Sequence, residues 1–388
     1  MTSRSCLDTL STIDGPGAEG SGRSLRPTRQ ALRMSRTFRV GTRGSRLALR
    51  QTDIVLDALR SSHPQALFDV RTIHTAGDRS RASLSEIGGR GVFVIELERA
   101  LLAGEIDLAV HSLKDLPSQE TPGVIVAAVG LREDPRDALV SRGDVPLRHL
   151  AEGAIVGTGS PRRAAQLRAL RPDLRIADIR GNVDTRIRKV QEGRYDATVL
   201  AAAGLARLGW LDKAAELLPP EVMLPAVGQG ALAVQVRADD AEAIDVVQAA
   251  DDHETHIAVS AERAFERRLG GGCHAAIAAF AVILSDDNAG TQDAASSRRH
   301  ALSALRTPML RSESSAEGNL GGGAGGVSTT DRSDSPRLRL RGLVADPNGG
   351  RLIRGEIEGP ASDAELLGAR LAEQLIERGA SALIETVL

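Results

Sequence analysis

The sequence has few aromatic residues, two cysteines and no long apolar run. Phe, Trp and Tyr make up 2% of the 388 residues, so the core has to be built from Ala, Val, Leu and Ile. The cysteines, Cys6 and Cys273, lie far apart, which excludes a disulfide framework and is typical of a reducing compartment. No segment approaches the ~18 consecutive apolar residues of a membrane span, and no apolar signal region is present. These absences favour a cytoplasmic protein with no membrane partner.

What the sequence does have is length and a local excess of positive charge. A chain of 388 residues is long enough for two or three domains. The net charge is only −2, yet residues 158–208 hold ten Arg and one Lys against five acids. Such a region indicates an anionic ligand, either a nucleic acid or a small polyanion. Because aromatic side chains for base stacking are scarce, we expect no nucleic-acid partner and favour a small molecule.

Strand and helix signals alternate in two successive blocks. In the first, "FRVGTR" and "LFDVRTI" predict strands, and "VFVIELERALLAG" predicts a helix closed by Gly104. In the second, "AIVGTGS" predicts a strand, Ser160 an N-cap and Pro161 the first helical position. Alternation of this kind predicts mostly parallel sheets covered by helices. The two blocks resemble the two α/β lobes of a periplasmic binding protein, with a cleft between them.

The remainder of the chain predicts a small C-terminal α+β domain. It has a helix at 254–269, strands at 275–284, 337–345 and 351–358, and a helix at 362–378. A segment rich in Ser, Gly, Ala and Asp interrupts it and is expected to be a disordered insertion. Met34 precedes the first predicted strand, so the start may be read as Met1 or Met34. The expected organisation is a disordered tail (1–36), lobe 1 (37–131 and 231–250), lobe 2 (132–230) and the C-terminal domain (251–388, with the insertion at 285–335).

Three predicted strands end in basic turns. "GTRGS" contributes Arg43 and Ser45, and "GTGSPRR" contributes Ser160 with two arginines; "LRGNVDTR" adds two more. Cations in the first turn of a helix oppose its dipole, which is unfavourable unless an anion is bound there. One such turn alone would favour a solvated arginine face. Three at the ends of parallel strands favour a binding crevice for carboxylates, which arginine holds with two hydrogen bonds.

Two further segments carry candidate chemical groups. "AVHSLKDLPS" ends a strand with Lys114 and Asp115, where the carboxylate could cap a turn or, among arginines, stabilise a cation or move a proton. Cys273 follows three glycines in "RRLGGGCHAAI" and could be a small buried hydrophobe, but a glycine loop favours an accessible thiol. A Cys–His nucleophile with His274 is disfavoured because adjacent side chains point apart. No ligand spacing indicates a metal site.

These segments resemble the hydroxymethylbilane synthase (porphobilinogen deaminase) family. The resemblance covers residues 37–284 and 336–388 and rests on several motifs standing together in one order. They are "TRGSRLAL", "AVHSLKDLP", "REDPRDALVS", "GTGSPRRAAQL", "RGNVDTR", "LAAAGLARLG", "LPAVGQGALA" and "AERAFERRLGGGCHAAI".

The resemblance implies an enzyme that adds four porphobilinogen molecules, each losing ammonia, to a dipyrromethane cofactor. Hydrolysis then releases the linear tetrapyrrole hydroxymethylbilane. Cys273 would carry the cofactor through a thioether, and Asp115 with Lys114 would be catalytic. The resemblance implies Lys114, Ser160, Arg162 and Arg163 as cofactor-binding residues. For substrate binding it implies Arg43, Ser45, Arg90, Arg180, Arg186 and Arg207. A monomer is the family expectation.

Two departures from the family pattern concern charge. Glu86 and Ile95 stand where relatives often have lysine, whereas Arg90 replaces a lysine and keeps the charge. The alternative function is a non-enzymatic, two-lobed anion-binding or ligand-sensing protein, which would not need Cys273 on a glycine loop.

Overall fold

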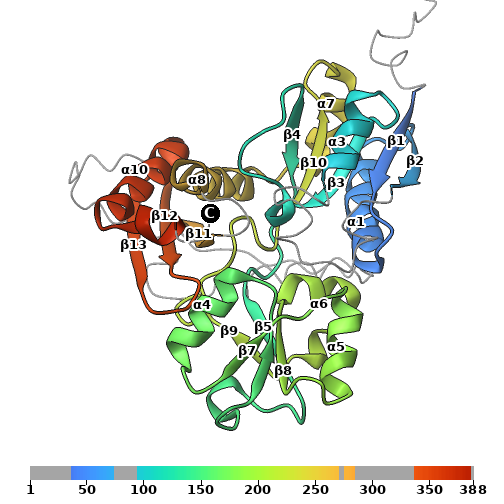
Figure 1. The fold of residues 1–388 in the computed structure, drawn as a ribbon. Helices are drawn as coiled ribbons and strands as arrows, with labels where there is room; N and C mark the ends of the chain where they lie inside the picture. Colours follow the sequence, from blue (N-terminus) through green and yellow to red (C-terminus); the bar gives the residue numbers. More distant parts are fainter. Residues whose placement is uncertain (1–35, 74–93, 271–274, 285–335, 386–388) are drawn as a thin grey trace, which may run out of the picture.

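A computed structural model describes residues 36–73, 94–270, 275–284 and 336–385, which form three sheets with helices packed on them (Figure 1). Two predicted site residues, Cys273 and Arg90, lie outside the described residues, as do Glu86, the predicted tail up to residue 35 and the predicted insertion at 285–335.

The first sheet has the strand order β2-β1-β3-β10-β4. Its strands are β1 (Thr37–Thr42), β2 (Leu67–Thr72), β3 (Leu108–Ser112), β4 (Val124–Val129) and β10 (Leu232–Arg237). The strand β1 pairs in parallel with β2 and β3, whereas β10 runs antiparallel to both of its neighbours. The helices of this part are α1 (Arg46–Ser62), α3 (Ile95–Leu102) and α7 (Ala241–Val247). Buried residues such as Phe38, Val40, Leu56 and Leu108 form its core.

The second sheet repeats that plan with the order β7-β6-β8-β5-β9. Its strands are β5 (Asp137–Ser141), β6 (Ile155–Gly157), β7 (Arg175–Ala177), β8 (Ala197–Ala201) and β9 (Glu216–Leu218). Here β5 is the strand that runs antiparallel to its neighbours. The helices are α4 (Pro161–Leu170), α5 (Val183–Gln191) and α6 (Ala202–Leu208). Arg46 of α1 lies 5.0 Å from the ring centroid of Trp210, just after α6, so the two lobes touch here.

The third unit is an antiparallel sheet covered by helices. It consists of β11 (Ala276–Leu284), β12 (Arg337–Ala345) and β13 (Leu352–Pro360), with α8 (His253–Leu269), α10 (Ala364–Glu377) and α11 (Ala380–Glu385). The helices α8 and α10 lie side by side (Figure 1). They approach so closely that a Cβ at Gly368 would stand 2.2 Å from the carbonyl oxygen of Ala261. A residue larger than glycine at 368 would therefore push the helices apart.

A buried carboxylate joins the three units. Glu262 of α8 accepts hydrogen bonds from Arg132 Nη1 at 2.6 Å, from the Gly228 amide at 2.7 Å and from the Ala281 amide at 2.8 Å. Arg132 and Gly228 belong to the two chain segments that cross between the lobes, and Ala281 belongs to β11. The side chain of Glu262 is fully buried, so one acidic group holds both crossings against the C-terminal unit.

The predicted fold class is confirmed, with two differences in detail. Four strands of each large sheet run in one direction and the fifth opposes them, and neither β5 nor β9 was predicted as a strand. The helix start at Ser160 is confirmed, since its hydroxyl accepts from the Arg163 amide with Pro161 in the first turn. Gly104 closes α3 with φ +66°, as expected for a left-handed helix end.

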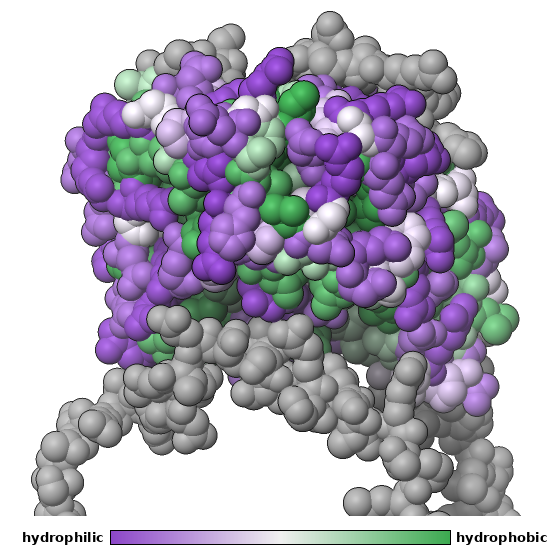
Figure 2. Space-filling model, turned by 90° about the horizontal axis from the view of Figure 1, so that it is seen from below, coloured by the Kyte–Doolittle hydropathy of each residue, from purple (hydrophilic) through white to green (hydrophobic). Residues whose placement is uncertain are grey.

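The face of the molecule seen in Figure 2 is predominantly polar. Hydrophilic side chains cover most of the face in Figure 2, and hydrophobic ones lie between them in smaller groups. Among the described residues, no helix has both the length and the apolar character needed to cross a membrane.

Candidate active site

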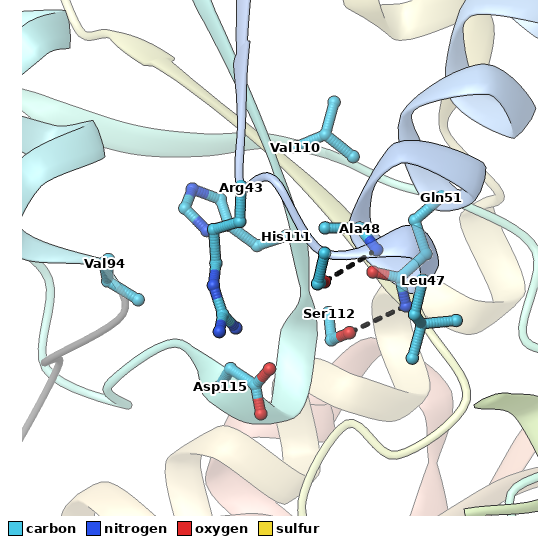
Figure 3. A pocket seen from close by; sticks show the side chains of 10 residues that line it. Arg43, Leu47, Ala48, Gln51, Val94, Val110, His111, Ser112 and Asp115 are labelled. Carbon is cyan, nitrogen blue, oxygen red and sulfur yellow. Dashed lines mark hydrogen bonds between the residues drawn. The ribbon is translucent and has the colours of Figure 1, made fainter. Parts of the chain in front are cut away.

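A pocket of about 60 Å³ opens where β1 and β3 end (Figure 3). The turn after β1 supplies Arg43 and Ser45, whose hydroxyl accepts from the Ala48 amide at 3.2 Å and so begins α1. One turn further along α1, Gln51 donates from Nε2 to the Ser112 hydroxyl at 2.8 Å. This bond ties the helix to the end of β3, so both walls of the pocket are fixed by side-chain hydrogen bonds.

Asp115 closes the pocket below Arg43. It ends a short 3₁₀ turn, Leu113–Asp115, directly after β3. The side chain is exposed, and its carboxylate lies on the same side of the pocket as the Arg43 guanidinium (Figure 3). A reactive carboxylate with solvent access beside cations can offset positive charge or transfer a proton.

Lys114 stands between the two lobes. Burial of its ammonium group, together with the positive charges of Arg163 and Arg162, lowers the pKa of Lys114 to about 8. Asp115 and Asp137 oppose that shift without cancelling it. Burial is the main cause of this shift, so an anion bound beside the ammonium group would favour its charged form.

The two arginines that begin α4 are buried against Asp137. Arg162 donates to this carboxylate at 2.7 Å and Arg163 at 2.7 Å, and Gln229 adds a bond at 3.0 Å. Arg162 also donates to the carbonyl oxygen of Leu224 and Arg163 to that of Val199, while Arg162 Nε is buried and has no partner among the described residues. One carboxylate of the protein thus compensates part of the positive charge at this helix start. Burial alone would raise the pKa of Asp137, but the two arginines hold it well below the usual range.

The other predicted residues that the structure describes, Arg180, Arg186 and Arg207, lie on lobe 2. Arg186 donates to the Gly181 carbonyl oxygen at 2.8 Å. Burial and the charges of Arg163 and Arg180 lower the pKa of Arg186 to about 10, and Asp115 opposes the shift. Arg180 pairs with Asp178 at 2.8 Å, partly exposed. Arg207 donates to the Gly230 carbonyl oxygen at 2.6 Å, so it contacts the segment in which the chain crosses from lobe 2 back to lobe 1.

The structure thus gathers Arg43, Ser45, Lys114 and Asp115 with the Arg162–Arg163 pair and Arg186, while Arg207 lies at the crossing. Asp137 was not singled out from the sequence, although it stands in the quoted motif "REDPRDALVS". The available signal was an acid opening a short apolar strand, where burial demands a cationic partner. Gln229, which orients the same carboxylate, has no comparable local signal.

Removing the charge of Asp137 is expected to destabilise the second lobe. The substitution Asp137→Asn leaves two buried guanidinium groups without their anion, a change that typically costs about 3–5 kcal/mol. We expect the melting temperature to fall by roughly 5–10 °C in thermal unfolding followed by circular dichroism. Asp173→Asn, which weakens a partly exposed pair with Arg171, is the control and should change much less. Equal melting temperatures for both variants would contradict this account of Asp137.

The fold and the pocket define a class: a two-lobed α/β protein whose pocket combines an arginine with an exposed carboxylate. Residues 38–245 match the family model "Porphobilinogen deaminase, dipyromethane cofactor binding domain", and residues 256–291 match "Porphobilinogen deaminase, C-terminal domain". The chain belongs to the porphobilinogen deaminase family, whose first domain model is that of a dipyrromethane cofactor site.

Individual relatives agree over nearly the full length. The chain is 44% identical to the porphobilinogen deaminase of Roseiflexus sp. (strain RS-1), across 90% of this chain and 99% of the relative. It is also 44% identical to that of Brevibacillus brevis, across 90% and 97%. Among solved structures, the periplasmic aliphatic sulphonate binding protein SsuA of Escherichia coli matches with a TM-score of 0.34 and 16% identity, over 60% of this chain and 70% of that one. A similarity of that size has no bearing on function. Family membership disfavours the non-enzymatic alternative.

Proposed function

We propose that this chain converts four porphobilinogen molecules and one water molecule into hydroxymethylbilane and four molecules of ammonia. The observation that carries the proposal is the exposed Asp115 carboxylate in a pocket shared with Arg43 and close to Lys114 and Arg186. Porphobilinogen carries an acetate and a propionate, which match the cations. Asp115 offsets positive charge that develops on a pyrrole and moves protons at its carboxylate oxygens.

Dipyrromethane fits the residues around this pocket. We propose that it is attached through a thioether to Cys273 and held by Lys114, Ser160, Arg162 and Arg163. The support for this fit is the lowered pKa of Lys114, because carboxylates placed beside the buried ammonium group would favour its charged form. When bound, the cofactor supplies the pyrrole carbon to which porphobilinogen units are joined.

Substrate carboxylates are assigned to a second set of groups. We propose that Arg43 and Ser45 bind them within the pocket, and that further arginines of the chain complete the binding surface. These further residues are Arg90, Arg180, Arg186 and Arg207. Arg186 is the best placed of the described ones, since its charge interacts with that of Asp115 across the lobes.

Two measurements on the purified protein test the function. The intact mass should exceed the sequence mass by one dipyrromethane unit. Incubation with porphobilinogen should release one ammonia per porphobilinogen consumed and form hydroxymethylbilane, detected by its cyclisation. An unmodified mass together with no consumption of porphobilinogen would reject the proposal.

Lys114 offers a test that does not depend on turnover. The chain has three lysines, so the ammonium signals can be followed by NMR and assigned with Lys114→Met. In protein without cofactor, Lys114 should titrate with a pKa of about 8, because burial and arginine charges disfavour its protonated form. It should be fully charged below that pH and lose its charge as the pH rises through about 8. With the cofactor attached, the pKa of Lys114 should rise. An unchanged titration midpoint would show that the cofactor carboxylates do not lie beside Lys114.

We also propose the domain division stated from the sequence, with lobe 1 at 37–131 and 231–250, lobe 2 at 132–230 and the C-terminal domain at 251–388. A cytoplasmic location and a monomeric state complete the proposal. Size-exclusion chromatography with light scattering tests the monomeric state.

A further inference from the structure

The turn that carries Asp115 is anchored by the residues on either side of it. Leu113 and Leu116 are buried, at 1% and 5% exposure, whereas Asp115 between them is exposed. The Leu113 amide donates to the Ala231 carbonyl oxygen at 3.1 Å. The chain that crosses back from lobe 2 lies so close that a Cβ at Gly228 would stand 2.8 Å from the Leu113 side chain. The position of the Asp115 backbone therefore depends on these buried neighbours.

The C-terminal unit adds a further anchor after this turn. Arg263 of α8 donates from Nη2 to the Pro117 carbonyl oxygen at 3.0 Å, although the two residues lie 146 positions apart. Arg263 is 7% exposed. One turn earlier on α8, Val259 is 1% exposed and packs in the same apolar cluster as Leu113 and Leu116. The helix thus contacts the Asp115 segment with one apolar and one cationic side chain.

Pro117 makes this hydrogen bond effective. The proline ring fixes φ at about −65°, so little freedom remains between the Pro117 carbonyl group and the backbone of Leu116. Proline also has no N–H group that could tie this position to its own lobe. The guanidinium contact at the carbonyl oxygen therefore restricts the chain just after Asp115.

The charge of Arg263 is compensated from both units that the contact joins. Burial lowers the pKa of Arg263, and the charge of Glu266 opposes this shift. The positive charge of Arg267 adds to the shift, whereas Glu120 and Glu365 oppose it. Glu266 and Glu365 belong to helices of the C-terminal unit, and Glu120 lies in lobe 1. The guanidinium group thus interacts with carboxylates on both sides of the contact.

We propose that Arg263 is a positioning residue for Asp115. Its hydrogen bond to the Pro117 carbonyl oxygen holds the turn so that the Asp115 carboxylate stays in the pocket, on the same side as the Arg43 guanidinium (Figure 3). A displacement of about 1 Å can reduce turnover by up to about 100-fold, because a charged group has to stand where charge develops in the reaction. The catalytic part of this inference rests on the proposed function.

Loss of this contact is expected to affect the chemical step rather than substrate binding. Arg43 and Ser45, which we propose to bind substrate carboxylates, follow β1 and are not part of the Asp115 turn. Arg263→Met removes the guanidinium group but keeps an unbranched side chain. We expect it to lower kcat about tenfold and to leave KM for porphobilinogen within about threefold. Arg263→Lys should keep kcat within about threefold, because one carbonyl oxygen needs only one donor.

The matched control is another arginine that joins a lobe to the C-terminal unit. Arg168 of α4 donates from Nη1 to the carbonyl oxygen of Pro347, in the turn between β12 and β13. Arg168→Met should also lower the melting temperature, because it removes a hydrogen bond of the same kind, but it should leave kcat within about threefold. Activities are compared well below both melting temperatures.

Three kinetic results would contradict a positioning role of Arg263. The first is an unchanged kcat in Arg263→Met. The second is an equal loss of kcat in Arg168→Met, since any loosening of the C-terminal unit would then account for the effect. The third is an Arg263→Lys variant that melts like the wild type but loses as much kcat as Arg263→Met. If Arg263→Met does not fold, Arg263→Gln takes its place, because its shorter side chain withdraws the donor from Pro117.

The stability of the turn can be followed without any turnover. The Leu116 amide donates to the Leu113 carbonyl oxygen at 3.0 Å and so closes the turn. Hydrogen exchange of residues 113–118, measured by mass spectrometry, should be about fivefold or more faster in Arg263→Met and unchanged in Arg168→Met. Unchanged exchange in Arg263→Met would overturn the inference. Absence of turnover in the wild type would instead refute the proposed function, whatever the exchange rate.

Discussion

Turnover by Asp115→Asn is expected to be roughly 100- to 1000-fold slower than that of the unchanged protein, because preorganised charge of this kind contributes about 3–4 kcal/mol to lowering a barrier. Asparagine keeps the shape and hydrogen-bonding capacity of the side chain but removes its charge. The side chain of Asp115 is exposed at the end of a short 3₁₀ turn, so the fold should not depend on that charge. The measurement is single-turnover consumption of porphobilinogen, with the cofactor content of each preparation checked by mass.

Two comparisons make the result specific. Asp115→Glu keeps the charge but displaces it by one methylene, and should retain a small fraction of the activity. Asp173→Asn removes a carboxylate from a turn of lobe 2 and should leave turnover unchanged. An Asn variant that carries the cofactor and turns over within about threefold of wild type would reduce Asp115 to a turn residue.

The second large effect is expected at Cys273, which lies outside the described residues. Cys273→Ser should fold, carry no covalent dipyrromethane and show no turnover, because a hydroxyl is a far weaker nucleophile than a thiolate. Intact mass and porphobilinogen consumption are the readouts. The helix α8, which ends at Leu269, packs against α10 and holds Glu262, so the position of this helix does not depend on the thiol.

The other cysteine of the chain is the control. Cys6→Ser changes the same atom in the predicted tail and should leave both mass adduct and turnover intact. A mass adduct that persists in Cys273→Ser, or that disappears in Cys6→Ser, would move the attachment point away from Cys273.

Local patterns predicted the elements whose signals are local. Ser160, Pro161 and Gly104 mark helix ends by their own conformations, and the structure has those helix ends. The strands β5 and β9 escaped prediction because they are five and three residues long and lie among turn residues. Their identity as strands depends on pairing with β8 and with each other, which is tertiary information.

The candidate site shows the same limit. The basic turns with Arg43, Arg162 and Arg163 could be found because each follows a strand. The partner of these last two arginines could not be found in this way, because Asp137 lies 25 residues before Arg162 and belongs to β5, a strand that α4 does not follow directly. The hydrogen bond between Gln235 and Glu98 likewise joins residues 137 positions apart, on β10 and α3. Sequence thus located the cations, whereas the groups that orient them required the fold.

The order of the strands also has a consequence for synthesis on the ribosome. Lobe 2 is built from consecutive strands, β5 to β9, so it can complete its sheet as soon as residue 218 has emerged. The first sheet cannot, because β10 stands between β3 and β4 and is made after all of lobe 2. Until then β3, which ends at the pocket, pairs with β1 alone. Since chains are made from the N-terminus, lobe 1 begins before lobe 2 but is completed after it. The strand preceding Asp115 gains its second neighbour only at that later stage.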